Sequence, residues 1–373
     1  MGRAAAYSPH RRQPIHRGDS DPGAGVDRRP DNHAGEGRVT LLDTLIGHHE
    51  VRQRLEHRLH DGKFPHALLL LGPPGVGKGL LARGLAQALL CATPKRGVAC
   101  GACPACRQIE DPTVGHPDLM GIEPVGKKRE IPIDAVRQAN AWLGLTPLAA
   151  KRRLLILDGA DRLNRFSANA LLKTLEEPAP GAHLILLGVS TARVLPTILS
   201  RCVKMHLHPV AQPDLLVWLS QKYPDLPETS LARAAVIGGG APGVARGWLE
   251  EKRLKIMERF GEDAAILARC EPASLLEMAQ RWVSMDDFEA IGILIRAWLR
   301  QFFDAMIPQD GGSGFGLTPL PGAVEPQRLL QAEERITLWE EDLERMVNPL
   351  LATEGLLIDL QRVLVHGRKA YRT

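Results

Sequence analysis

The sequence predicts an α/β protein whose parallel sheet carries a phosphate-binding loop and is followed by helical domains. The stretch Gly72–Gly79 reads GPPGVGKG and separates the apolar run Ala67–Leu71 from a segment with leucines at helical spacing. A second apolar run, Leu154–Asp158, ends in a carboxylate, as expected for a buried parallel strand with a site at its carboxyl end. From about residue 252 onward, the apolar positions follow a helical period.

The composition is that of a soluble protein of two or three domains. The chain has 373 residues, of which 44% are apolar and 24% charged, with a formal net charge of +4; this charge permits a nucleic-acid partner without requiring one. Residues 1–40 contain no leucine, so we expect a disordered tail. The sequence has no apolar signal-peptide core and no run of 18 apolar residues, which predicts a cytoplasmic protein without a membrane partner.

Folded structure is expected from Leu41 onward. A helix with Val51, Leu55 and Leu59 on one side is followed by the first strand. Beyond the loop, the next helix is expected to run to about Leu90, where the apolar pattern breaks.

The loop itself is typical of mononucleotide-binding proteins. Gly72, Gly75 and Gly77 allow backbone N–H groups to surround a phosphate at a helix N-terminus, and Lys78 would reach the terminal phosphates. The pattern requires serine or threonine after the lysine, because that hydroxyl binds Mg²⁺, but this chain has Gly79. The sequence therefore predicts a phosphate cradle without one metal ligand, and it leaves open whether ATP binds.

Four cysteines follow the helix after the loop, with the spacing C-x8-C-x2-C-x2-C. They are Cys91, Cys100, Cys103 and Cys106. Thiols this close together predict a structural zinc site with four thiolate ligands and no open position. One alternative is a set of reduced thiols in a loop. The other is an iron–sulfur cluster, which is disfavoured because Arg107, and no fourth spaced ligand, follows the third cysteine of the C-x2-C-x2-C run. Cys202 and Cys270 stand apart, and we expect ordinary buried thiols there.

The strand Leu154–Asp158 places Asp158 at the Walker B position, beside the expected Mg²⁺ site. In a working ATPase of this type, a glutamate that activates water follows, but this chain has Gly159. Asp161 is expected on the next turn and is a poor substitute. General-base catalysis contributes about 10²–10⁴-fold, so Gly79 and Gly159 independently predict a site that does not hydrolyse ATP.

Further elements are expected along the rest of the chain. They are a turn at 115–118, a short strand at Ile131–Ile133, a helix capped by Asp134 that runs through Val136 and Trp142, a helix at Ser167–Glu177, and strands at His183–Leu187 and Val203–Leu207. In the C-terminal part, one helical stripe contains Phe288, Ile291, Ile295, Trp298 and Phe302. A flexible loop is expected at 307–327, which is rich in glycine and proline.

The cysteine cluster after the P-loop helix, the segment Asn169–Pro178 and the triplet Ser200-Arg201-Cys202 resemble bacterial clamp-loader subunits of the AAA+ class. The resemblance covers residues 41 to about 250. It implies three domains, which are a P-loop domain at 41–207 with a zinc module at 91–106, a helical lid at 208–251 and a helical C-terminal domain at 252–373. The C-terminal domain would form a collar for ring assembly.

The resemblance also implies partners and a role. The partners would be the ATPase subunits and the delta subunit of a DNA polymerase III clamp loader, the sliding clamp within that complex, and primed DNA. Motor subunits of the family keep both residues that Gly79 and Gly159 replace, so this chain looks like a member that does not hydrolyse ATP. One alternative is an active motor with unusual Mg²⁺ ligation. Another is a separate zinc-dependent nucleic-acid-binding protein. This alternative is disfavoured because only 4% of residues are aromatic. A basic run such as Lys127–Arg129, near the zinc module, is more often a solvated loop than a binding site.

Arg201 is the candidate catalytic residue. In the family this arginine points across a subunit interface at ATP bound by the neighbour, so the resemblance implies an arginine finger that acts in trans. A planar guanidinium suits the charge that develops on a transferring phosphoryl group. The alternative for Arg201 is an internal ion pair.

Overall fold

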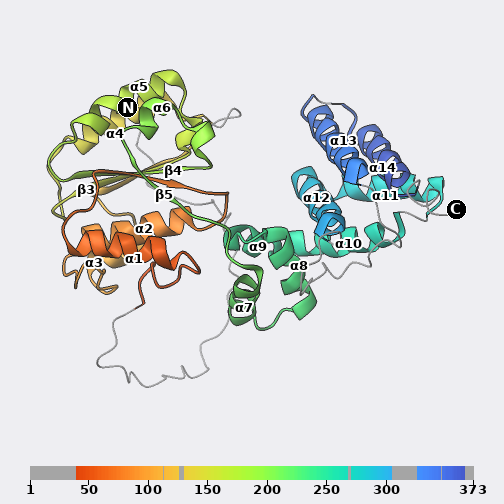
Figure 1. The fold of residues 1–373 in the computed structure, drawn as a ribbon, viewed down its shortest axis with the longest axis horizontal. Coiled ribbons are helices and arrows are strands. Elements are labelled where there is room, and N and C mark those ends of the chain that lie inside the picture. The colour runs from red at the N-terminus through yellow and green to blue at the C-terminus, as the bar shows by residue number, and fades with distance from the viewer. Residues whose placement is uncertain are drawn as a thin grey trace, which may run out of the picture. The chain divides into compact units, whose positions relative to one another are not determined.

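The computed structural model describes residues 39–111, 113–125, 130–267, 270–304, 326–345 and 347–365 (Figure 1). It divides into two compact units, Met1–Val210 and Ala211–Thr373. The predicted tail up to residue 38, the predicted loop 307–327 up to residue 325 and the basic run Lys127–Arg129 lie outside the described residues. The last two residues of that predicted loop, 326 and 327, are instead helical.

The first unit is built on a parallel five-stranded sheet in the order β2-β3-β4-β1-β5 (Figure 1). The strands are β1 Ala67–Leu71, β2 Leu119–Ile122, β3 Arg153–Asp158, β4 Ala182–Gly188 and β5 Val203–His206. Parallel neighbours need crossover connections, which the helices between them supply. Because β1, β3 and β4 lie inside the sheet, their apolar runs are almost completely buried.

Helices cover both faces of this sheet (Figure 1). On one face lie α1 His49–His60, α2 Lys78–Leu90 and α3 Pro104–Glu110, and on the other lie α4 Ile133–Leu143, α5 Arg165–Glu176 and α6 Pro196–Leu199. Short 3₁₀ turns at Ala160–Arg162 and Thr191–Arg193 follow β3 and β4. The α/β class predicted from the sequence, with a glycine loop between the first strand and a long helix, is confirmed.

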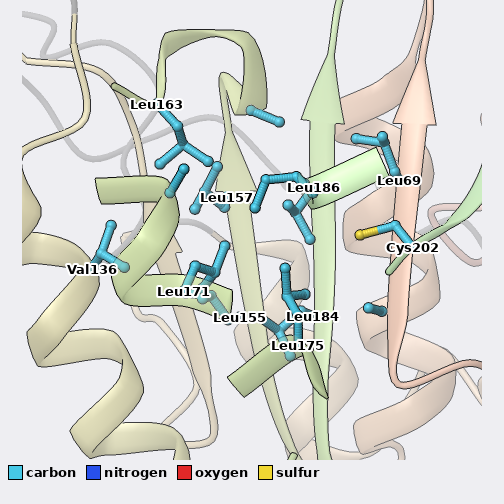
Figure 2. Packing of buried hydrophobic residues seen from close by; sticks show 14 of the residues in the cluster. Leu69, Val136, Leu155, Leu157, Leu163, Leu171, Leu175, Leu184, Leu186 and Cys202 are labelled. Atoms are coloured by element: carbon cyan, nitrogen blue, oxygen red, sulfur yellow. The ribbon is translucent and has the colours of Figure 1, made fainter. Parts of the chain in front are cut away.

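Each face of the sheet has its own hydrophobic core, because successive strand residues point to opposite faces. The core under α4 and α5 includes Leu69, Leu155, Leu184, Val136 and Leu171 (Figure 2). The core under α1 and α2 includes Leu68, Leu154, Ile185, Leu55 and Leu81. The two layers fix the carboxyl ends of β1 and β3, and with them the glycine loop and Asp158.

One predicted strand is wrong. Ile131 forms only a single bridge with Leu163, and α4 begins two residues later with Pro132 as its N-cap. Proline has no N–H to give to a strand ladder, and its fixed φ suits the residue before a helix. Asp134 therefore lies inside the first turn rather than at the cap. The elements α3 and β2 and the short helix α6 were not predicted from the sequence.

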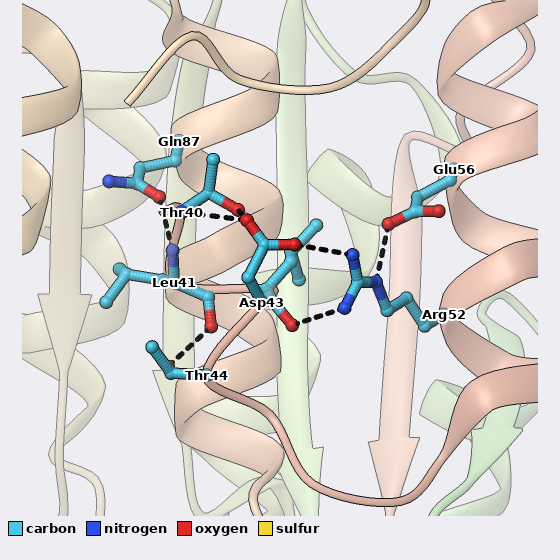
Figure 3. Close-up of polar contacts among 8 residues, drawn as sticks. Thr40, Leu41, Asp43, Thr44, Arg52, Glu56 and Gln87 are labelled. Carbon is cyan, nitrogen blue, oxygen red and sulfur yellow. Dashed lines mark hydrogen bonds and ion pairs between the residues drawn. The ribbon is translucent and has the colours of Figure 1, made fainter. Parts of the chain in front are cut away.

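The last two residues of the predicted tail, 39 and 40, are described by the structure. Thr40 is 5% exposed, and its N–H and hydroxyl both donate to the carboxylate of Asp43 at 2.8 Å (Figure 3). Arg52 of α1 donates to Asp43 and Glu56, each at 2.7 Å. This polar network fastens the segment before α1 to the helix.

The second unit is helical throughout its described residues. Its helices are α7 Gln212–Lys222, α8 Glu228–Gly238, α9 Pro242–Trp248, α10 Glu251–Leu267, α11 Pro272–Ser284, α12 Phe288–Asp304, α13 Pro326–Glu344 and α14 Pro349–Val365. The predicted stripe on α12 is buried at Ile291, Ile295 and Trp298. Among the described residues, every helix is too short or too polar to cross a membrane.

The unit boundary at Val210 lies close to the predicted end of the P-loop domain at residue 207. The predicted lid, apart from its first residues, and the predicted collar fall within one compact unit. Their separation into two domains remains a prediction.

A buried ion pair holds the loop between α4 and β3. The carboxylate of Asp118 accepts hydrogen bonds from the backbone N–H groups of residues 148–150 at 2.7–2.8 Å. The guanidinium of Arg153 lies 3.6 Å away and donates to the carbonyls of Trp142 and Thr146. Burial disfavours the charged form of Asp118, but the hydrogen bonds and Arg153 outweigh it, so the pKa lies below its ordinary value.

We expect Asp118→Ala to lower the free energy of unfolding by about 3–5 kcal/mol, because it leaves Arg153 as an uncompensated buried charge. Urea unfolding at neutral pH measures this loss. Since the folded pKa of Asp118 is depressed, its contribution is present above the unfolded pKa and is lost as the pH falls through the folded pKa. Glu176→Ala removes the carboxylate that pairs with Arg201 near the surface. This change should lower the free energy of unfolding by at most about 1 kcal/mol. Equal losses in the two variants would contradict the buried-pair interpretation.

Candidate functional site

The glycine loop between β1 and α2 has a backbone that depends on glycine. The φ angles of Gly72, Gly75 and Gly77 are 154°, 73° and 114°, in the region that other residues rarely adopt. A Cβ on Gly72 would lie 2.4 Å from the carbonyl oxygen of Leu207, and one on Gly77 would lie 2.8 Å from Leu45. The loop therefore leaves little room for a side chain at Gly72 or Gly77. Its role in nucleotide binding stays a prediction.

Lys78 opens α2 and folds back over this loop. Its ammonium donates to the carbonyl oxygens of Gly72 at 2.6 Å and Pro73 at 2.8 Å. Burial lowers the pKa of Lys78, and the negative charges of Asp158 and Asp161 oppose this effect. The fold thus brings the predicted phosphate ligand and the Walker B carboxylate into one electrostatic environment. A phosphate would have to draw Lys78 away from the two carbonyls.

The residue after Asp158 is fixed as glycine by its backbone and its surroundings. Gly159 has a φ of 93°, and a Cβ there would lie 2.8 Å from Cγ of Pro124 and 3.2 Å from Cγ of Arg162. Asp161, in the following turn, accepts a hydrogen bond from the N–H of Val189 at 3.2 Å and is only 6% exposed. Its carboxylate holds the end of β4, which does not suit it for activating water.

His48 also contacts the loop, and it was not predicted as a site residue. It is the N-cap residue of α1 with a φ of 56°, and its Nε2 lies 3.0 Å from the carbonyl oxygen of Val76. Burial lowers the pKa of His48, which favours a neutral ring that donates to this carbonyl. Gly47 also has a positive φ, and a glycine just before a helix is the sequence signal that could have indicated this turn.

The four cysteines converge as a tetrahedral metal site requires. All four Sγ atoms lie within 4.8 Å of one another, and the pairs Cys91–Cys103 and Cys100–Cys106 are separated by 3.9 Å and 4.0 Å. Four sulfurs at the usual Zn–S distance of about 2.3 Å would lie about 3.8 Å apart. All are free thiols. The cluster can therefore hold a metal ion, and its geometry suits zinc.

A short hairpin and a helix bring these cysteines together. Lys95 and Val98 exchange backbone hydrogen bonds of 2.9 and 3.0 Å around two residues with φ of 50° and 78°, as in tight hairpin turns. The helix α3 starts at Pro104 with the proline in its first turn, which suits proline because it lacks an N–H. It carries Cys106 to a fully buried position.

Backbone N–H groups point at the sulfurs. Cys100 donates its N–H to Sγ of Cys91, and Cys103 donates to Sγ of Cys100, both at 3.3 Å. A hydrogen bond from the Thr93 side chain, together with hydrogen bonds from backbone N–H groups, lowers the pKa of Cys100 to about 6. Burial raises the pKa of Cys106. A bound cation would favour the thiolate at every position, because metal binding displaces the thiol protons.

Two side chains of α2 hydrogen-bond to α3, which carries Cys106. Gln87 is 1% exposed; its Nε2 donates to the carbonyl of Cys106 at 3.0 Å, and its Oε1 accepts from the N–H of Leu41 at 3.0 Å (Figure 3). Arg83 donates to the carbonyl of Ile109 at 2.6 Å. A lone glutamine among the apolar residues of α2 was the available signal for this buried link.

Arg201 lies between α6 and β5 and is paired within its own chain. Its Nε donates to the carboxylate of Glu176 at 2.7 Å, its Nη1 donates to the carbonyl of Thr197 at 3.0 Å, and its side chain is 32% exposed. The internal ion pair considered as an alternative therefore exists. Because an exposed pair contributes about 0–1 kcal/mol, it would not prevent Arg201 from turning to another anion. Cys202 is buried, as expected, and Cys270 is half-buried.

Comparison with known proteins identifies similar sequences. Residues 47–211 match the family described as "DNA polymerase III, delta subunit". The chain is 36% identical over 197 residues to DNA polymerase III subunit delta' of Pseudomonas aeruginosa, which covers 52% of this chain and 60% of that protein. It is 34% identical over 170 residues to DNA polymerase III subunit tau of Escherichia coli, which covers 46% of this chain and 26% of that protein.

This chain therefore spans less than two thirds of the length of these relatives. The resemblance to clamp-loader subunits of DNA polymerase III, predicted from the sequence, is confirmed. Among solved structures, a DNA polymerase III gamma subunit-related protein of Thermotoga maritima aligns with a TM-score of 0.46 and 18% identity, over 83% of this chain and 98% of that one.

Proposed function

We propose that this chain is a delta-prime-type subunit of a DNA polymerase III clamp loader, which does not hydrolyse ATP and helps to place the sliding clamp on primed DNA. The observation that carries this proposal is the geometry at Gly159. Its φ is positive, and Pro124 lies within 2.8 Å of the point that a Cβ would occupy, which leaves no room for a catalytic glutamate. The catalytic base is therefore missing for a reason that includes the conformation of the main chain, and restoring one side chain would not be enough.

Each candidate site has a distinct role in this proposal. The loop at Gly72, Gly75 and Gly77, with Lys78 and Asp158, retains a phosphate-binding form but not hydrolysis. The four cysteines hold a structural zinc ion that takes no part in chemistry, because four thiolates leave no open position. Arg201 acts on ATP bound by a neighbouring ATPase subunit. The delta subunit, the ATPase subunits, the clamp and the DNA are the proposed partners.

The similarity to subunit tau supports a second candidate, a motor subunit of the same loader. A motor subunit would have to bind Mg²⁺ without a hydroxyl at Gly79 and activate water without a carboxylate at Gly159. Asp161 is the nearest acidic alternative, but its carboxylate accepts the hydrogen bond from Val189. The first candidate therefore accounts for the site better.

We expect the isolated chain to show no ATP turnover. Gly79→Thr should strengthen binding of Mg²⁺-ATP, since Gly79 lies in α2 and threonine supplies the missing ligand, but turnover should remain absent. Gly159→Glu should not restore turnover and should destabilise the first unit by about 1–3 kcal/mol because of its strained backbone. Phosphate release, nucleotide titration and urea unfolding measure these effects.

Lys78→Ala is the control for both measurements, because it removes the phosphate ligand and leaves the glycine backbone intact. ATP turnover that stays with the unmodified chain through purification, and that disappears in Lys78→Ala, would favour the motor candidate. So would turnover gained by Gly79→Thr alone.

A further inference from the structure

The strand β5 forms one edge of the sheet and lies beside an open groove. In the strand order it has β1 on one side, and among the described residues no strand pairs with its other side. The groove has a volume of about 560 Å³ and is lined by residues of α1 and β5. They are Gln53, Arg54, His57, Arg58, Val203, Lys204 and Met205.

The lining combines an apolar floor with a basic rim. Val203 and Met205 are half-buried and pack against the core under α1 and α2. Arg54, Arg58 and Lys204 are exposed, and none of the described residues that line the groove is acidic. Arg54 lies 3.5 Å from Glu50 on its own helix, but both side chains are largely exposed, at 68% and 87%, so this pair is weak and easily replaced.

The backbone of β5 can accept another strand on this side. Val203–His206 pairs in register with residues 68–71 of β1, and Leu207 donates its N–H to the carbonyl of Leu71 at 2.7 Å. Backbone groups of successive strand residues point to opposite sides. The N–H and C=O groups of Lys204 and His206 therefore point away from β1, toward the open edge.

We propose that β5 and α1 form a docking site for an acidic, extended peptide segment of another protein. The segment adds to the outer edge of β5 as a sixth strand, through the backbone groups of Lys204 and His206. Its alternate apolar side chains enter the groove over Val203 and Met205, and its carboxylates meet Arg54 and Arg58.

The groove favours a peptide over a nucleic acid. A nucleic-acid strand would use its phosphates on the basic rim but would stack its bases on aromatic side chains, and the part of the lining that the structure describes contains no phenylalanine, tyrosine or tryptophan. An apolar floor beside a free strand edge instead matches the two requirements of strand addition, which are backbone hydrogen bonds and pockets for alternate side chains. Charge then selects acidic segments.

The test uses the full chain and a fluorescein-labelled eight-residue peptide in which valine and glutamate alternate. Fluorescence polarisation should show saturable binding below about 1 mM, and Arg54→Glu with Arg58→Glu should weaken it by about tenfold or more. Met205→Glu should weaken it similarly. Lys173→Glu, an exposed charge reversal on α5, is the matched control and should leave binding unchanged.

Two modified peptides test the mode of binding. N-methylation at the alternate positions that face β5 should abolish binding, whereas methylation of the other set should not, because only one edge of an added strand is hydrogen-bonded. Absence of saturable binding, equal binding of a valine–lysine peptide, or equal effects of both methylated sets would overturn the proposal. So would tighter binding of a single-stranded oligonucleotide that is lost in the same charge-reversal variant.

Discussion

Removal of metal from the four-cysteine cluster is expected to unfold residues 91–110 and to destabilise the first unit. The cluster has almost no apolar core of its own, since its buried residues are Cys91, Ala99 and Cys106. In small zinc modules the metal-binding free energy, about 10–16 kcal/mol at neutral pH, is folding free energy. Because Gln87 and Arg83 hydrogen-bond to this segment, its loss would also expose buried polar groups of α2.

Protein purified without chelators should contain one zinc ion per chain by elemental analysis. Cys103→Ser should lose the metal and the hydrogen-exchange protection of α3, and a strong chelator should reproduce both effects on the unmodified chain. Cys270→Ser is the matched control, because Cys270 lies outside the cluster, and its metal content should be unchanged. Zinc-free protein, or unchanged metal content and melting temperature in Cys103→Ser, would exclude the zinc assignment.

The sequence was most informative where the physical cause is local. The apolar runs that form β1, β3 and β4 are continuous because inner parallel strands are buried on both faces. The cysteine ligands lie close together in sequence, so their spacing alone predicts a metal site. The glycine loop is recognisable because its backbone angles require glycine.

Elements that depend on distant partners were not predictable in this way. The strand β2 has only four residues, and three of them are half-buried, so its apolar pattern is short and its identity comes from pairing with β3. The helix α3 has seven residues, and Pro104 is its only strong start signal. Asp118 lies in a turn, as predicted, but its pairing with Arg153 was not predictable, because Arg153 lies on the distant strand β3.

The candidate site shows the same division. The sequence shows glycine at the position where a glutamate is expected, but it does not show that a Cβ there would lie 2.8 Å from Pro124, which is far from it in the chain. An internal ion pair of Arg201 was anticipated only as an alternative, and its partner Glu176 was not anticipated, because a charged side chain near the surface can have many partners. Such contacts are set by the packing of α5 against α6, which no local pattern encodes.

Arg201→Ala is expected to lower ATP turnover at the neighbouring subunit by about 10³-fold in the assembled loader, and to slow clamp loading. The magnitude is that of an arginine supplied in trans in small GTPases, about 10³–10⁵-fold. Folding and zinc content should be unchanged, because the pair with Glu176 is exposed and contributes at most about 1 kcal/mol. Arg201→Lys should restore little activity, since a point charge cannot reproduce the planar fork of a guanidinium.

Glu176→Gln separates a trans role from a structural one. It weakens the same ion pair but leaves the guanidinium, so a structural role for the pair predicts that Glu176→Gln and Arg201→Ala have similar effects on the loader. If Arg201 instead acts on the neighbour's ATP, Glu176→Gln should keep full turnover or raise it, because the arginine is released from a competing carboxylate. The measurement is clamp- and DNA-stimulated ATPase of the reconstituted complex with one substituted subunit. Full turnover with Arg201→Ala would leave this chain as a scaffold of the ring.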